Sequence, residues 1–159
     1  MFRAPTAWGR RGGHVYKAGR VQPPADVAER LGVSATTKSV LRRENVFYAD
    51  DDPVNRVTTY IRVAIAKGTG LLQDEVLHQF GIHGIFEEQH HVMTRLREEV
   101  STRMPKPEET RLLRLRPGVP VLNVWQTSID RDGQLYELTR FVMRGDMTGL
   151  LYDVPVEWQ

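Results

Sequence analysis

The chain has 159 residues, of which 40% are apolar and 26% are charged, and its formal net charge is +2. These values are ordinary for one globular domain, they exclude a low-complexity chain, and the small net charge does not indicate nucleic acid as a partner. No apolar run reaches the ~20 residues of a membrane helix, and there is no cysteine for a disulfide, a thiolate nucleophile or a cysteine-based zinc site. We therefore expect a cytoplasmic protein without a membrane partner.

The first half of the chain predicts a linker, a strand, a short helix and a hairpin. The expected ranges are a linker at residues 1–13, a strand at 14–22, a helix from Pro24 to Gly32, and hairpin strands at 40–48 and 54–62. Proline suits the first turn of the helix, and Gly32 is placed to end it in the left-handed conformation. Three aspartates at 50–52 before Pro53 predict the hairpin turn, and we favour a solvated turn over a cation site there.

The second half predicts helices, a strand and a closing hairpin. The expected ranges are helices at 71–80 and 84–89, a strand at 91–103, a helix that begins at Pro107, and a hairpin around a turn at 130–133. No glycine-rich phosphate loop joins a strand to a helix, which disfavours a parallel nucleotide-binding sheet. The order of elements predicts an α+β domain, residues 14–159, whose mainly antiparallel sheet is covered on one face by helices.

The spacing of the histidines and serines gives little support for a metal site or a catalytic nucleophile. The histidines are His14, His78, His83, His90 and His91. Two ligands on one helical face need an i, i+4 relation, Gly81 interrupts the chain between His78 and His83, and adjacent histidines point in different directions. The serines considered as nucleophiles are Ser34, Ser39, Ser101 and Ser128, and none of them lies in a nucleophile elbow. We therefore predict no metal, no cofactor and no catalytic residue.

Polar side chains are concentrated on the hairpin strands. They are Arg43, Asn45, Thr59, Tyr60, Glu137, Thr139 and Arg140. In a strand of period two, Arg43 and Asn45 share a face, as do Glu137 and Thr139, so two strands can bring a cation, an amide, a carboxylate and a hydroxyl together. Such a set suits a small polar ligand, because Arg offers a planar fork of donors and Glu accepts protons. The alternative is an exposed strand face with ordinary cross-strand ion pairs.

The order of short motifs from residue 15 to 152 resembles the UTRA domain, the effector-binding module of GntR-type bacterial transcription regulators of the histidine-utilisation-repressor (HutC) subfamily. The motifs are Pro23-Pro24-x-x-Val27-Ala28-x-x-Leu31-Gly32, Arg43 with Val46 to Tyr48 before the aspartate turn and Pro53-Val54, Glu98-Glu99-x-x-x-Arg103-x-Pro105, Glu108-Glu109-x-x-Leu112-Leu113, Gly118-x-Pro120-Val121-Leu122, and Asp130-x-Asp132-Gly133 followed by Glu137 and Arg144-Gly145-Asp146.

The resemblance implies a fold similar to chorismate lyase, a homodimer, and a ligand pocket between sheet and helices. Relatives that bind phosphorylated sugars surround the ligand with residues that match Arg43, Asn45, Glu137 and Met143, commonly Arg, Arg, Glu and Tyr. Asn45 and Met143 depart from that set, so the pattern is compatible with a phosphosugar and equally with a less anionic or more apolar effector.

The function implied by the resemblance is to bind a small-molecule effector that modulates DNA binding. Family regulators carry a winged helix-turn-helix ahead of this domain, and the first helix expected here already belongs to the effector module. We therefore expect contact with operator DNA only through an N-terminal module absent from this sequence, which favours a fragment over a stand-alone sensor.

Two other functions remain open from the sequence. One is an enzyme of the chorismate lyase type, which shares the implied fold and acts on a small aromatic carboxylate. The other is a dimerisation module without a ligand, in which Phe141 and Met143 fill the pocket. Release of pyruvate from chorismate would favour the enzyme, and a melting temperature indifferent to every metabolite would favour the dimerisation module.

Overall fold

The computed structural model describes residues 14–72 and 81–155, and all statements on structure refer to these residues. The elements in chain order are β1 (His14–Val21), α1 (Ala25–Leu31), β2 (Val40–Ala49), β3 (Asp52–Arg62), α2 (Val63–Ala66), the 3-10 turn η1 (Gly70–Leu72), α3 (Gly81–Glu88), β4 (Met93–Arg103), α4 (Pro107–Leu112), β5 (Val121–Asp130) and β6 (Leu135–Arg144).

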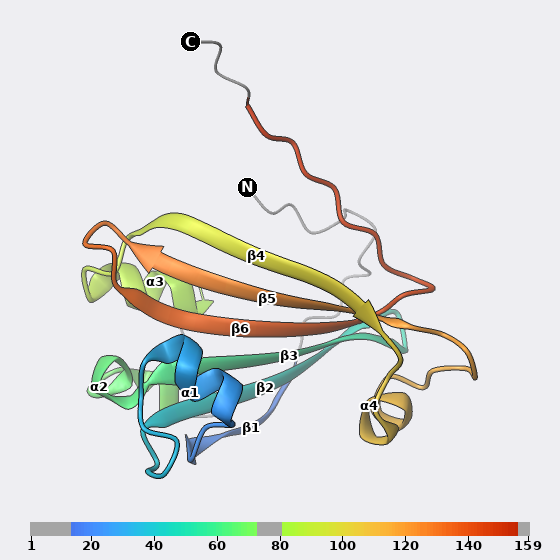
Figure 1. Cartoon of the computed structure of the whole chain (residues 1–159), viewed down its shortest axis with the longest axis horizontal. Helices are drawn as coiled ribbons and strands as arrows, with labels where there is room; N and C mark the ends of the chain where they lie inside the picture. The colour runs from blue at the N-terminus through green and yellow to red at the C-terminus, as the bar shows by residue number, and fades with distance from the viewer. Residues whose placement is uncertain (1–13, 73–80, 156–159) are drawn as a thin grey trace.

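The six strands form one sheet in the order β1-β2-β3-β6-β5-β4, and every neighbouring pair is antiparallel. The first three strands and the last three each form a meander, and the β3–β6 pair joins these two halves at the centre of the sheet (Figure 1). This arrangement confirms the expected α+β class and both hairpins.

Residues opposite one another in antiparallel strands point to the same side of the sheet, so the register defines two faces. We name them after β6. The Glu137 face carries Glu137, Thr139, Phe141 and Met143, and the Arg140 face carries Leu138, Arg140, Val142 and Arg144.

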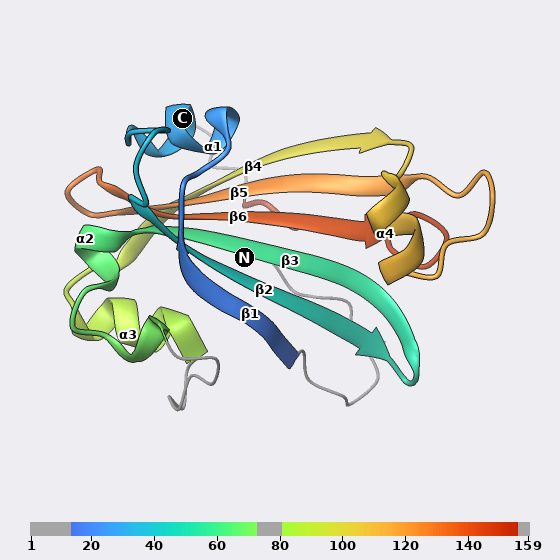
Figure 2. The ribbon, with the colours of Figure 1, turned by 90° about the horizontal axis from the view of Figure 1, so that it is seen from below.

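Helices cover both faces, which corrects the prediction of helices on one face only. On the Arg140 face, Leu31 of α1 packs near one end of the sheet with Val40, Tyr60, Trp125 and Leu138, and a second cluster forms between the chain after α4 and the strands. On the Glu137 face, the cluster contains residues of α2, η1 and α3 together with Leu41 and Ile61. Figure 2 shows α1 and α3 on opposite sides of the sheet. The central strand β3 is buried on both sides, and its near-continuous burial requires a cover for each face.

Helix α1 forms as its sequence predicts. Val27, Ala28 and Leu31 are buried on one side, and Gly32 follows with φ 61° and ψ 42°, the left-handed conformation. The amide of Gly32 bonds to the carbonyl of Glu29, and that of Val33 bonds to the carbonyl of Ala28, which satisfies carbonyls that the helix end leaves without partners.

Helix α4 begins at Pro107, as expected, and a buried acid fixes its first turn. Glu109 is 2% exposed, and its carboxylate accepts the backbone amide of Lys106 at 2.8 Å and two bonds from the Arg103 guanidinium at 2.7 and 2.8 Å. A carboxylate at a helix start is favoured by the free amides and by the helix dipole. Because Arg103 ends β4, this contact ties that edge strand to α4.

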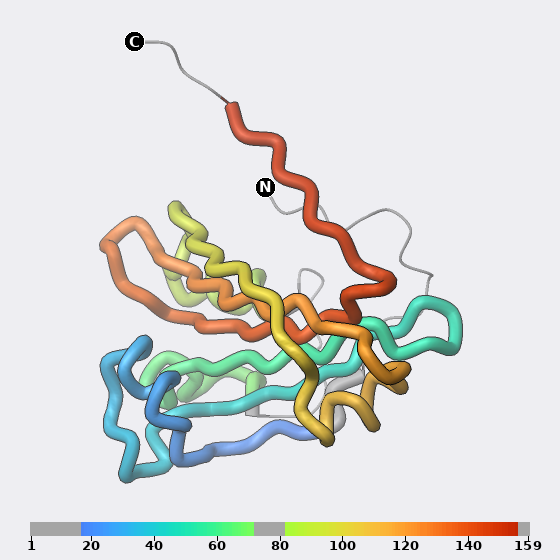
Figure 3. The backbone as a smooth tube through the Cα atoms, turned by 45° about the vertical axis from the view of Figure 1, so that its right-hand side comes forward, coloured from blue at the N-terminus to red at the C-terminus, as the bar shows by residue number. Residues whose placement is uncertain are grey.

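Some local predictions were incomplete. Helix α2 was not predicted, and α3 begins at Gly81 rather than at Gly84. The helix expected at 71–80 lies mostly outside the described residues, apart from its start in η1, and the linker at 1–13 lies wholly outside them. After β6 the chain leads away from the sheet through exposed residues 151–155 (Figure 3). None of the helices in the described ranges is long and apolar enough to cross a membrane.

Candidate functional site

A buried chain of hydroxyl and carboxylate groups crosses the middle of the Glu137 face. Thr139 donates to Oε1 of Glu137 at 2.9 Å, and Oγ1 of Thr59 lies 3.0 Å from Oγ1 of Thr139 across the β3–β6 pair. Ser128 on β5 donates to Oε2 of Glu137 at 3.1 Å. Since Thr139 has one hydroxyl proton and gives it to Glu137, Thr59 is the donor in the threonine pair. Each of these four side chains is at most 4% exposed.

Arg43 lies in the same row as these threonines, because it is directly opposite Thr59 on β3, which is opposite Thr139 on β6. Its guanidinium donates to the carbonyl oxygen of Leu71 in η1, and the side chain is 2% exposed. A buried arginine and a buried glutamate thus lie on the same face, with the threonine pair between their strands.

Two amide oxygens on this face have no hydrogen-bond partner among the residues that the structure describes. They are Oδ1 of Asn45 and Oδ1 of Asn55, and both atoms are buried. Asn45 follows Arg43 by two residues on β2, and Asn55 is opposite Met143 on β6. A buried polar atom without a partner costs about 1–3 kcal/mol, so these oxygens are suited to accept bonds from a ligand.

Helix α3 brings a histidine to the carboxylate. Nδ1 of His83 lies 3.8 Å from Oε2 of Glu137, and the His83 side chain remains half exposed. This places an imidazole beside the end of Glu137 that also receives Ser128. From the sequence, His83 is a candidate only for a metal ligand, and Ser128 only for a nucleophile.

Six of the eight residues predicted from the sequence lie on the Glu137 face. They are Arg43, Asn45, Thr59, Glu137, Thr139 and Met143. The other two, Tyr60 and Arg140, lie on the opposite face, where both contact Trp125. Tyr60 belongs to the cluster under α1 and is 7% exposed. These two residues therefore cannot contact the same small ligand as Glu137.

The site prediction missed three residues, and two of them carried a readable signal. Asn55 has the parity of Thr59 on β3, four residues away, and therefore shares its face. Ser128 is opposite Glu137 across the closing hairpin. His83 had no such signal, because its position depends on how α3 docks on the sheet.

The hairpin end beside this face is fixed by a buried aspartate. Oδ2 of Asp130 lies 2.8 Å from Nδ1 of His91, and Oδ1 accepts the backbone amides of Asp132 at 3.0 Å and Gln134 at 2.8 Å. Burial opposes ionisation of Asp130, but the bonds from His91 and the two amides outweigh it and lower the pKa of this carboxyl.

An aromatic stack lies next to that aspartate. Tyr136 stacks on His91 at 5.5 Å between ring centroids and contacts Phe86 of α3 edge-on at 4.8 Å. Burial, with the nearby Glu137 carboxylate, raises the pKa of Tyr136 to about 12, so the phenol stays neutral at physiological pH. The stack joins α3 to the strand that carries Glu137.

The fold is that of a chorismate lyase-like α+β domain, and its sequence matches one family. A family model described as the UTRA domain matches residues 11–148. The match covers most of the chain, and the chain belongs to the UTRA domain family.

Individual relatives agree with this assignment. An HTH-type transcriptional regulator of Streptomyces coelicolor is 28% identical over 150 residues, which are 92% of this chain and 55% of the regulator. The chain thus spans about half the length of that relative. Among solved structures, a GntR-family transcriptional regulator from Enterococcus faecalis has a TM-score of 0.77 at 19% identity, covering 90% of this chain and 100% of that one. The effector domain of PhnF from Mycobacterium smegmatis has a TM-score of 0.72 at 23% identity, covering 89% and 87%.

Proposed function

We propose that this domain binds a small-molecule effector on the Glu137 face and thereby regulates a GntR-family transcription factor of the HutC subfamily. The observation that carries the proposal is that a buried arginine, Arg43, and a buried acid, Glu137, lie on the same face as the buried amide oxygen of Asn45, which lacks a partner among the described residues. The relatives are transcriptional regulators and their effector domains, which supports a sensing role.

The chemistry of this face favours a ligand with both hydrogen-bond donors and an acceptor group. Glu137 and the amide oxygen of Asn45 accept hydrogen bonds, so they suit hydroxyl or amine groups of a ligand. Arg43 supplies a positive charge beside them. A sugar derivative and an amino acid derivative both have these features. Met143 is 2% exposed and adds an apolar end to the face.

We infer that residues 14–159 form the sensing and dimerisation domain, that residues 1–13 are the end of a linker, and that a winged helix-turn-helix outside this sequence contacts operator DNA in the cytoplasm. Such control requires the effector to favour one dimer arrangement, since a ligand with equal affinity for two arrangements shifts nothing. The family match favours this role over an enzyme of the chorismate lyase type.

A thermal-shift screen tests the proposal. The purified domain is heated with sugar phosphates, amino acids, organic acids and aromatic carboxylates, because a ligand of the folded state raises stability by RT ln(1 + [L]/Kd). We expect one class to raise the melting temperature in a concentration-dependent way. The shift should be lost in Glu137→Gln and in Asn45→Leu, and kept in the control Glu108→Gln, which changes an exposed acid of α4.

Two results would contradict the proposal. A shift that survives both Glu137→Gln and Asn45→Leu would place the effector elsewhere. No shift with any class, together with a dimer by light scattering, would favour a dimerisation module whose pocket is filled by Phe141 and Met143.

A further inference from the structure

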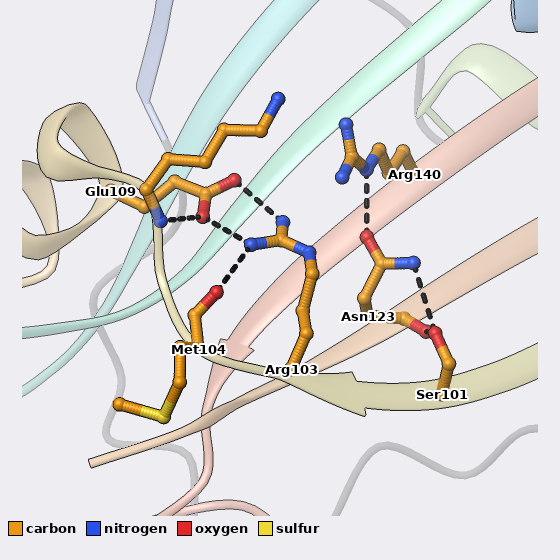
Figure 4. A network of polar contacts seen from close by, with 7 residues as sticks. Ser101, Arg103, Met104, Glu109, Asn123 and Arg140 are labelled. Carbon is orange, nitrogen blue, oxygen red and sulfur yellow. Dashed lines mark hydrogen bonds and ion pairs between the residues drawn. The ribbon is translucent and has the colours of Figure 1, made fainter. Parts of the chain in front are cut away.

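The Arg140 face contains a partly buried guanidinium that forms no ion pair within the described ranges, although Glu109 and Asp26 act on it through space. Nε of Arg140 donates to Oδ1 of Asn123 at 2.7 Å, and Asn123 in turn bonds to Ser101 at 3.3 Å. The two terminal nitrogens of Arg140 make no hydrogen bond or ion pair with any residue of the described ranges. In Figure 4 they point away from Asn123 and carry no contact to the residues drawn. Burial and the nearby Arg103 lower the pKa of Arg140, so its charge is costly to hold there.

The acids in ion pairs on this face belong to other arginines. Glu109 forms its two bonds with Arg103, as Figure 4 shows. Glu99 forms two bonds with Arg30 of α1.

Glu44, in the same cross-strand row as Arg140, pairs with Arg42 at 2.6 Å and with Arg56 at 3.5 Å. Asp26 of α1 acts on Arg140 only through space, and it is exposed. Among the described residues, none of these acids therefore forms an ion pair with Arg140.

Two aromatic side chains complete the surroundings of Arg140. The guanidinium lies 5.2 Å from the ring centroid of Trp125, which is directly opposite on β5. Tyr60, diagonal to Arg140 across the β3–β6 pair, lies 6.4 Å from Trp125 by ring centroids. The Tyr60 hydroxyl has no hydrogen bond to another described residue, and burial raises its pKa, so it remains a neutral donor.

We propose that Arg140 and Tyr60 bind a small oxyanion, a phosphate or carboxylate group, on the face of the sheet opposite the effector. The two terminal nitrogens of a guanidinium form a fork that matches two oxygens of such a group, and the tyrosine hydroxyl supplies a further donor. Trp125 contributes a cation–π contact to the guanidinium. A bound oxyanion would give the Arg140 charge a partner, which would explain why an arginine occupies this position in the sheet.

Titration with inorganic phosphate against chloride at constant ionic strength and pH tests the site. Trp8→Phe and Trp158→Phe leave Trp125 as the one emitting tryptophan. Its ring centroid lies 5.2 Å from the guanidinium carbons of both Arg140 and Arg30, so the Arg140 variant shows which arginine the emission reports. We expect a saturable change in emission and a matching rise in melting temperature. Arg140→Gln should weaken binding by at least about tenfold, as the loss of charge-assisted bonds predicts. Tyr60→Phe keeps the guanidinium and should weaken binding by about three- to tenfold.

Matched variants separate this site from nonspecific charge and from the effector site. Arg131→Gln removes an exposed arginine in the β5–β6 turn and should leave the phosphate response unchanged. In the effector screen, Arg140→Gln should keep any shift that Glu137→Gln loses, so a failure of the effector proposal and a failure of this site can be told apart.

Acetate replaces phosphate in a second titration. A response to either anion but not to chloride supports an oxyanion site, and the anion that responds shows whether the site prefers a phosphate or a carboxylate group. The proposal is overturned if neither anion gives a saturable response, if Arg140→Gln and Tyr60→Phe both respond like the parent, or if Arg131→Gln loses the response equally.

Discussion

The hydroxyl chain on the Glu137 face predicts that its two threonines are energetically coupled. In Thr139→Val the side chain keeps its shape, but Oε1 of Glu137 loses a donor and the Thr59 hydroxyl loses its acceptor. Leaving buried polar groups without partners costs about 1–3 kcal/mol, so we expect a loss of about 2 kcal/mol. For a domain of this size that corresponds to a fall of about 4–8 °C in melting temperature.

Thr59→Val alone removes one donor from the chain, and we expect it to cost about 1 kcal/mol. In the double variant the unsatisfied Thr59 hydroxyl no longer exists, so the two changes should cost less than their sum by about 1 kcal/mol. Urea unfolding followed by circular dichroism measures all four states of the cycle, with exposed Thr102→Val as a control expected to change nothing. Additivity within about 0.3 kcal/mol would refute the chain.

Two further variants test the packing and electrostatics that surround the site. A Cβ at Gly145 would lie 2.7 Å from the carbonyl oxygen of Pro120, so Gly145→Ala should destabilise the fold by about 1–3 kcal/mol, whereas Gly149→Ala meets nothing within 4 Å and should not. Equal melting temperatures for the two would contradict this reading. Because the folded-state pKa of Asp130 is lowered, its contribution is present above the unfolded value of about 3.9 and is lost as the pH falls toward the folded pKa. Asp130→Asn should thus be less stable than the parent at neutral pH and should lose less stability on acidification. Thermal unfolding across that pH range measures both effects. Parallel pH profiles for the two proteins would show that the charge of Asp130 does not contribute to stability.

Elements with strong local signals could be predicted from the sequence. The helix stop at Gly32 follows from glycine's freedom at positive φ, and both hairpins follow from alternation around aspartate- or glycine-containing turns. Helix α2 was missed because its four residues, Val63–Ala66, follow directly on a strand and are too short to show a period. Its place on the sheet depends on tertiary packing.

The placing of the candidate residues on one face could be predicted only in part, because the prediction combined residues of both parities. Adjacent residues of a strand point to opposite faces, so Thr59 and Tyr60 cannot share one, and neither can Thr139 and Arg140. Strand parity alone separates these pairs. The sequence does not show which parity on one strand matches which parity on another, because that requires the register of the β3–β6 pair. The docking of α3, which brings His83 to Glu137, also had no local signal.

The junction between β3 and β6 has a mechanical consequence. Arg43 and Asn45 belong to the first meander, and Glu137 belongs to the second, so a molecule that contacts all three would span the junction. Such a molecule acts as a reversible cross-link between segments that are distant along the chain, and pulling the halves apart requires its release. Effector concentration would then add to the force needed to open the sheet along its centre, where the protein itself contributes the backbone ladder of the β3–β6 pair and the Thr59–Thr139 hydrogen bond.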